Sequence, residues 1–260
     1  MNRGNALQKL AAEQGQQQRN QEAVASVRTA VAAYDEAIAV LRTLPLDAHH
    51  DYRNHLGAAW LNRGHAFISI SEFIPAASSF EAAISELAPL PRDTDPSYRL
   101  NIAGAWTNLA HVLLSQHEQQ LAESGPTLAR ARAAAETALS ELVEVQLTHV
   151  AFAEMSLRAR RALAMILGAQ LVLTEAARQP INELASAATD AIDEGLELAR
   201  ECERRGAAHF RPLAARLFRM GAQIYGVHQP QFLAEFLLDN VDPTDADAAF
   251  ASDLEFRSVA

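Results

Sequence analysis

The sequence has a single cysteine, few glycines and prolines, and no long apolar run. Cys202 is the only cysteine among the 260 residues, so an intramolecular disulfide and a cysteine-rich metal site are excluded, and a reducing compartment is expected. Its neighbours Glu201 and Glu203 oppose formation of a thiolate, which predicts an unreactive thiol. No window approaches eighteen uninterrupted apolar residues, and the first residues are polar, so neither a membrane span nor a secretory signal is expected. These features predict a cytoplasmic protein with no membrane partner.

The charge balance and the absence of reactive motifs also narrow the function. The formal net charge of −10 disfavours general affinity for nucleic acid or anionic lipid, because phosphate binding needs a concentrated cationic surface. The sequence has no glycine-rich phosphate loop, nucleophile elbow or H-E-x-x-H pair. His49-His50-Asp51 suggests a metal ligand set, but it lies where a helix is expected to start, and no further ligand follows at a suitable spacing. We therefore predict no catalytic residue, no cofactor and no metal, and a protein or peptide as the partner.

The composition and the spacing of apolar residues predict an all-α fold. Alanine, leucine, glutamate, glutamine and arginine dominate, and apolar residues at steps of three and four place a buried stripe on a helix that ends near Leu44-Pro45. Asp95-Pro96 is a strong helix start, since Asp95 can accept an unpaired backbone N–H and Pro96 suits the first turn. Further helices are expected at about 47–69, 73–87, 96–115, 155–174, 181–204, 210–225 and from 229 onward. The predicted organisation is one helical domain over residues 1–238, with a polar and frayed segment over 1–22, and an acidic tail over 239–260.

An internal repeat with a period of 46 residues is the strongest signal in the sequence. Its two copies are Tyr52-Arg53, Ala59-Trp60, Asn62 and His65, and then Tyr98-Arg99, Ala105-Trp106, Asn108 and His111. Further along, Ala83 to Leu87 recurs as the similar segment Ala138 to Leu142, displaced by 55 residues, so nine residues have been inserted between about 116 and 127. A chain that repeats one supersecondary unit stacks its copies into a solenoid with a long groove, which predicts binding before catalysis.

The repeated unit resembles the tetratricopeptide repeat (TPR). The residues that carry the resemblance are Trp60-x2-Arg63-Gly64-x2-Phe67, then Ala76-x3-Phe80 and Ala83, with partial copies Trp106-x2-Leu109-Ala110-x2-Leu113 and Leu217-x2-Met220-Gly221-x2-Ile224. The match covers residues 34–142 and is weak elsewhere, and Arg63 stands where the family has an apolar residue. The resemblance implies a right-handed α-solenoid of stacked antiparallel helix pairs, in a long-helix variant, that acts as an interaction module.

One face of each repeated helix is expected to be packed. Gly57 and the following alanines allow close helix approach. Arg53 lies seven residues before Trp60, so its stem is expected to cover the indole, and Arg99 is expected to do the same for Trp106.

The opposite face carries the predicted peptide-binding groove. Its members are polar residues at helical spacing in the two copies: His55, Asn62, His65, Ser69, Asn101, Asn108, His111 and Ser115. The resemblance implies that the first helix of each unit lines a concave groove, in which an asparagine at the position of Asn62 binds a peptide backbone or a terminal carboxylate. The lysine of a carboxylate clamp is missing, because Leu61 and His65 stand in its place. The alternative is that Asn62 and Asn108 connect successive helices by hydrogen bonds.

A second candidate surface is a basic patch made of Arg204, Arg205, Arg211, Arg216 and Arg219, for which Arg158, Arg160 and Arg161 are further candidates. Arginine forks suit carboxylates and phosphates, whereas the alternative is a solvated face with ordinary ion pairs. A further hypothesis is that the acidic tail covers this patch.

The leading functional hypothesis is a non-catalytic adaptor that binds an extended peptide or a partner helix in the groove. Two alternatives stay open: a small-ligand sensor or enzyme that uses a pocket around His65 and His111, and a homo-oligomeric scaffold formed through the end helices. A closed cavity at the two histidines would favour a small ligand, and an open channel would favour a peptide.

Overall fold

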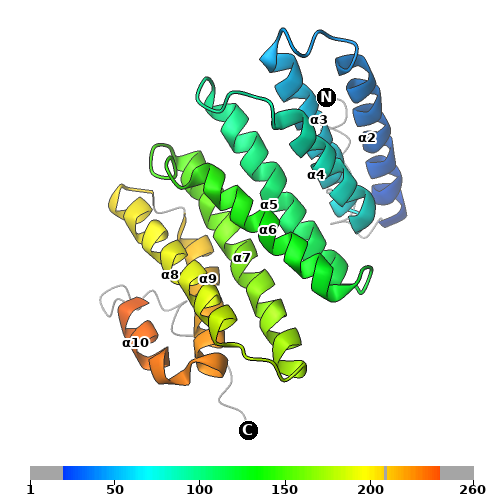
Figure 1. Ribbon diagram of the computed structural model, residues 1–260. Coiled ribbons are helices and arrows are strands. Elements are labelled where there is room, and N and C mark those ends of the chain that lie inside the picture. Colours follow the sequence, from blue (N-terminus) through cyan, green and yellow to red (C-terminus); the bar gives the residue numbers. More distant parts are fainter. Residues whose placement is uncertain (1–19, 208–209, 241–260) are drawn as a thin grey trace. The chain divides into compact units, whose positions relative to one another are not determined.

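The computed structural model describes residues 20–207 and 210–240, and every regular element in these ranges is a helix (Figure 1). The all-α prediction is therefore confirmed for this part of the chain. The frayed segment expected at the N-terminus falls outside the described residues except for residues 20–22, and the acidic tail falls outside them from residue 241. No helix in the described ranges is both long enough and apolar enough to cross a membrane.

The chain divides into two compact units, the first ending at Gln146 and the second starting at Leu147. The division lies inside the range 1–238 that the sequence predicts as one domain. Unit 1 contains α2 (Asn20–Leu41), α3 (His50–Ile68), α4 (Phe73–Leu87), α5 (Pro96–Glu118) and α6 (Ser124–Leu142). Unit 2 contains α7 (Val150–Ala176), α8 (Asn182–Arg204), α9 (Arg211–His228) and α10 (Pro230–Asn240).

Within each unit, helices that follow one another in the sequence pack against one another. In unit 1 this holds from α2 to α6, and α3 also contacts α5. In unit 2, α7 contacts α8 and α9, and α9 contacts α10. The two copies of the 46-residue repeat thus begin on neighbouring helices, α3 and α5, each of which pairs with the helix that follows it.

Local sequence signals explain where several helices begin and end. Asp95 caps α5 as predicted, since its carboxylate accepts the backbone N–H of Ser97 at 2.7 Å. At the ends of α3 and α5, Ser71 and Gln120 have φ angles of 59° and 55°, and the residue after each donates its N–H to the carbonyl five residues earlier. This is the Schellman arrangement that glycine usually closes. The two connections between paired helices in unit 1 therefore open in the same way.

The nine inserted residues lengthen the second helix pair by about one turn on each side. Displacement of α3 by 46 residues predicts that α5 ends at residue 114, whereas it ends four residues later, at Glu118. Displacement of α4 by 55 residues predicts that α6 starts at residue 128, whereas it starts four residues earlier, at Ser124. The connection itself gains one residue. Gly125-Pro126 lies in the first turn of α6.

A glycine set against a large side chain closes three contacts in two of the helix pairings. A Cβ atom on Gly64 would lie 2.6 Å from the ring of Phe80, and one on Gly57 would lie 2.5 Å from Leu87, so α3 approaches α4 closely only because these positions are glycine. In unit 2, a Cβ atom on Gly221 would lie 2.4 Å from Phe236, which places the same kind of contact between α9 and α10. This third contact lies at the partial match that begins at Leu217.

Arg63, the departure from the TPR pattern, connects three helices. Its guanidinium lies over the rings of Trp60 and Phe67, at 5.3 and 4.8 Å from their centroids. The same group donates to Asp35 on α2 at 2.7 Å and to Ser79 on α4 at 2.8 Å. An arginine is accommodated here because carboxylate, hydroxyl and aromatic faces together satisfy its charge.

The predicted stacking of Arg53 on Trp60 is wrong. Arg53 pairs with Asp47, in the connection before α3, and with Glu86 on α4 at 3.3 Å, while the cations over the Trp60 ring are Arg42 and Arg63. Two carboxylates within reach of a half-buried guanidinium bind it more strongly than an aromatic face does.

The second copy repeats this arrangement. Arg99 pairs with Asp93 at 2.7 Å and donates to the backbone carbonyl of Glu141 at 3.0 Å. Asp93 and Glu141 are the equivalents of Asp47 and Glu86 by the displacements of 46 and 55 residues. The repeated arginine therefore connects the start of one helix to the end of the next helix.

Candidate functional site: a polar stripe on two neighbouring helices

All eight residues of the predicted groove lie on α3 or α5, or directly after α3. His55 and Ser69 are exposed, and the other six are half-buried, so none of the eight belongs to the core. Because α3 contacts α5, the two rows belong to adjacent helices. We call this set the polar stripe: His55, Asn62, His65, Ser69, Asn101, Asn108, His111 and Ser115.

One end of the polar stripe is used to connect the two helices. The side chain of Asn101 donates to the side-chain oxygen of Asn54 at 2.8 Å, and Asn54 in turn donates to Ser97 at 3.3 Å. Tyr98 donates its hydroxyl to Asp51 at 2.7 Å. Asn101 is therefore a structural residue, and the amide contact between successive helices that the sequence analysis raised for Asn62 and Asn108 is made by a different pair.

Little in the sequence indicates this connection between α3 and α5. Asn54 has no counterpart in the second copy, where Leu100 occupies the equivalent position, so the repeat does not single it out. Tyr98 does recur, but its counterpart Tyr52 packs its ring on His49 with a centroid separation of 5.0 Å. The hydrogen bond to Asp51, with burial, raises the pKa of Tyr98 to about 12.

Asn62 and Asn108 occupy the middle of the polar stripe and keep their amides available. Both are half-buried, and within residues 20–207 and 210–240 neither side chain has a hydrogen-bond partner. A primary amide carries two donor hydrogens and one acceptor oxygen, and a half-buried amide leaves these groups to water or to a ligand. The two copies thus present the same amide from neighbouring helices.

The remaining polar stripe residues are partly engaged by the fold. The imidazole of His65 meets the ring of Phe80 edge-on, with centroids 5.5 Å apart, so the helix contact that includes Gly64 also fixes His65. Ser69 donates its hydroxyl to the carbonyl of Ala66 at 2.7 Å. In the described ranges, no cluster of three or more histidine, cysteine, aspartate or glutamate side chains is placed to bind a metal ion.

The five arginines of the predicted basic patch have different surroundings. Three of its members pair with glutamates, as the ion-pair alternative proposed: Arg204 with Glu197 and Glu201, Arg205 with Glu201, and Arg211 with Glu203. The other two, Arg216 and Arg219, line a hollow of about 300 Å³ in unit 2 together with Arg161 of α7.

The other residues considered for the patch and for reactivity are also paired or buried. Arg158 and Arg160 are paired with Glu154 and Glu194, so Arg161 is the one of the three that reaches the hollow. Cys202 is buried, and this burial raises the pKa of its thiol, which agrees in direction with the prediction of an unreactive cysteine.

No protein-family model matches this chain, and no curated protein matches it. Two similar solved structures are both of Nro1. One is the S. pombe nuclear import adaptor Nro1, with 13% identity, coverage of 96% of this chain and 97% of that chain, and a TM-score of 0.30. The other, described as the hypoxic regulator of sterol synthesis and a nuclear import adaptor, has 13% identity, coverage of 96% and 92%, and a TM-score of 0.32. At these TM-scores the likeness assigns neither a fold family nor a function.

Proposed function

We propose that unit 1 is a TPR-like interaction module, built as a right-handed solenoid, that binds an extended peptide segment of a partner protein along the polar stripe. The proposal is supported by the way α3 packs on α4, since Gly64 and Phe80 are the small and aromatic positions of the TPR pattern and lie against each other. The equivalent contact of Gly221 with Phe236 extends the argument to α9 and α10. A stack of such units presents its first helices side by side, which suits a long ligand.

The observation that carries the proposal is the contrast between two pairs of asparagines. Asn101 and Asn54 bond to each other, whereas Asn62 and Asn108 have no partner in the described residues. The backbone of an extended peptide offers alternating N–H and C=O groups, and a primary amide can serve both. We assign backbone recognition to Asn62 and Asn108, with His65 and His111 beside them.

Three features favour an internal peptide segment over other ligands. The lysine that completes a carboxylate clamp is absent, so the C-terminus of a partner is not the preferred ligand. The net charge of −10 disfavours nucleic acid. The hollow of about 300 Å³ is lined by residues of unit 2, and neither His65 nor His111 is among them. We therefore propose binding without catalysis, in the cytoplasm, with a protein as the partner.

The test uses peptides selected from a random display library on the full chain. Selected peptides are measured by titration against the wild type, against Asn62→Ala with Asn108→Ala, and against Asn54→Ala with Asn101→Ala. Each double variant removes two amides from the same two helices. The proposal predicts a loss of at least tenfold in affinity for the first variant and less than threefold for the second.

Two outcomes would reject this assignment. One is equal affinity of the wild type and the Asn62 and Asn108 variant for every selected peptide. The other is a loss of affinity that follows a loss of helical circular dichroism, because it would show that these asparagines support the fold.

A further inference from the structure

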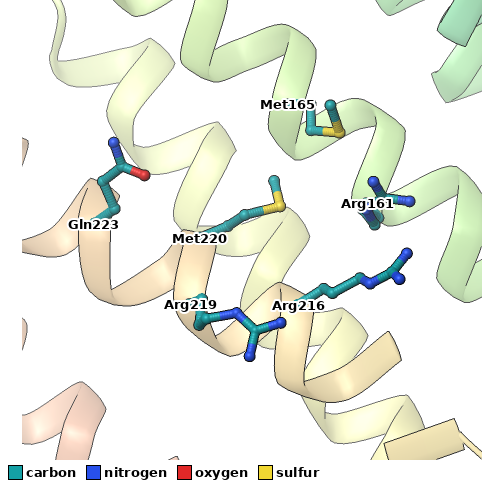
Figure 2. A pocket seen from close by; sticks show the side chains of 6 residues that line it. All are labelled: Arg161, Met165, Arg216, Arg219, Met220 and Gln223. Carbon is teal, nitrogen blue, oxygen red and sulfur yellow. The ribbon is translucent and has the colours of Figure 1, made fainter. Parts of the chain in front are cut away.

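The hollow in unit 2 is formed by one face of α7 and one face of α9. Its walls are Arg161 and Met165 from α7 and Arg216, Arg219, Met220 and Gln223 from α9 (Figure 2). The spacings of four residues on α7 and of three, four and seven residues on α9 place each set on one helix face. The site is therefore built on packed helices, which position side chains better than loops do.

Two arginines of the hollow, Arg161 and Arg216, differ from other arginines of unit 2 in their charged neighbours. Figure 2 shows Arg216 extending toward Arg161, and the pKa of Arg161 is lowered by burial and by the neighbouring charge of Arg216. No carboxylate partner of either arginine is found within the described ranges, although six other arginines of unit 2 pair with glutamates: Arg158, Arg160, Arg200, Arg204, Arg205 and Arg211.

This arrangement costs free energy unless an anion offsets it. Arg161 is partly buried and lies close to the exposed Arg216, so their two guanidinium groups repel each other with less screening than in bulk water. The chain has ten more acidic than basic residues, with 32 Asp and Glu against 22 Lys and Arg. A shortage of carboxylates in the chain therefore does not explain why none pairs with these two arginines. A bound anion would supply the missing negative charge.

The other residues that line the hollow indicate which kind of chemical group carries the anion. Guanidinium forks match the oxygens of carboxylates and phosphates, and Met165 and Met220 present flexible, polarizable thioether side chains. Gln223 adds an amide that can donate and accept. The volume of about 300 Å³ is at the lower end of the range for small-ligand sites, which is roughly 300–1,000 Å³.

We propose that this hollow binds a small ligand carrying an oxyanion on an apolar group. The oxyanion lies between the guanidinium groups of Arg161 and Arg216, and the apolar group lies against Met165 and Met220. The site belongs to unit 2 and is independent of the peptide function proposed for unit 1.

The experiment is a calorimetric titration of the full chain at low ionic strength with phenyl phosphate, benzoate and inorganic phosphate. Phenyl phosphate and benzoate distinguish the two oxyanions, and inorganic phosphate lacks the apolar group. We expect saturable 1:1 binding of phenyl phosphate or benzoate. Inorganic phosphate should bind at least fivefold more weakly than phenyl phosphate if phosphate is the preferred oxyanion.

Two arginine double variants with the same change in charge test the location. Arg161→Gln with Arg216→Gln should lower the affinity at least tenfold. Arg204→Gln with Arg211→Gln, which removes two arginines already paired with glutamates, should change the affinity less than twofold. The single variant Arg216→Gln, at an exposed position of α9, should still lower the affinity severalfold if the double variant fails to fold.

The proposal is overturned by the absence of saturable binding of both aromatic probes to the wild type. It is also overturned by an equal loss in the two double variants, which would reflect general charge attraction. A third contrary result is an unchanged preference for phenyl phosphate over inorganic phosphate in Met165→Ala with Met220→Ala, because it would remove the role of the thioether walls.

Discussion

The two helix pairs of unit 1, α3 with α4 and α5 with α6, come from one repeated sequence but fill their interiors differently. In the first pair Gly64 lies against Phe80, and a Cβ atom would collide with the ring. The displacements of 46 and 55 residues make Ala110 and Ala135 the equivalents in the second pair, and both are fully buried. A glycine opposite a phenylalanine in the first pair corresponds to two alanines in the second pair.

A second position has changed in the same paired way. Arg63 donates to the buried hydroxyl of Ser79, whereas the equivalents in the second pair are Leu109 and Ala134, both apolar and buried. At both places the residues of the two helices have therefore changed together, and we expect each change to depend on the other. Asn62 and His65 recur unchanged, and for Asn62 no side-chain hydrogen bond within the described residues explains the recurrence. Under the proposed function, this difference separates the packing positions of the repeated unit from its binding positions.

The largest expected effect is at the contact that only the first pair has. Phe80→Ala removes a fully buried ring and should lower the free energy of unfolding by about 3–5 kcal/mol. Ala135→Gly, at the equivalent position, should cost only about 1 kcal/mol. Urea titration followed by circular dichroism measures both, and similar losses at the two sites would contradict the account of unequal packing.

The effect of Gly64→Ala on the free energy of unfolding should change sign when Phe80 is also replaced by alanine. In the wild type the added methyl collides with Phe80 and should cost about 1–3 kcal/mol. In Phe80→Ala, the same change copies the second pair and should stabilise the helix by about 0.5–1 kcal/mol, since alanine loses less backbone entropy than glycine. Additivity of the two substitutions would show that they do not share a contact.

The first helix pair should tolerate the apolar residues of the second pair only when both Arg63 and Ser79 are replaced. Arg63→Leu leaves Asp35 and Ser79 without their donor and should cost about 1–2 kcal/mol. Adding Ser79→Ala should restore part of the loss. A further loss in the double variant, measured by thermal unfolding, would count against compensated divergence.

These predictions also show what the sequence can provide. Helix positions follow from spacing and from signals such as Asp95-Pro96, and the repeat identifies the polar stripe on α3 and α5. The partners of Arg53 were missed, because a spacing of seven residues shows which face it shares with Trp60 but not which carboxylates compete for it. The recurrence of Asp47 as Asp93 was an available signal.

The hollow of unit 2 is harder to foresee. Its charge comes from Arg161 on α7 and Arg216 on α9, and the sequence does not show that these two helices meet. The basic patch was predicted from sequence proximity, which grouped Arg204 and Arg211 with Arg216. Arg204 and Arg211 are paired with glutamates, whereas Arg216 has no such partner within the described residues.

The smallest effect on the free energy of unfolding at neutral pH is expected for a substitution of Tyr98. This tyrosine differs from its counterpart Tyr52 by its hydrogen bond to Asp51. The pKa of Tyr98 is raised to about 12 in the folded state, whereas unfolded tyrosine titrates near about 10. The folded state therefore binds more protons between these values, and stability that is present below about pH 10 is lost as the pH rises toward 12.

Tyr98→Phe should accordingly flatten the alkaline loss of stability, measured as the free energy of unfolding between pH 9 and 12. Tyr34, whose pKa burial also raises to about 12, keeps its share of the slope in both proteins. Tyr52→Phe is the matched control and should leave the slope close to that of the wild type. An unchanged slope in Tyr98→Phe would contradict the hydrogen bond to Asp51.

The most direct test of the central claim is an NMR titration of the asparagine side-chain NH2 groups with a library-selected peptide. The account predicts that the NH2 signals of Asn62 and Asn108 shift at saturation, while that of Asn101, bonded to Asn54, stays in place. Unchanged Asn62 and Asn108 signals with the peptide fully bound would contradict the assignment of these two amides to ligand binding.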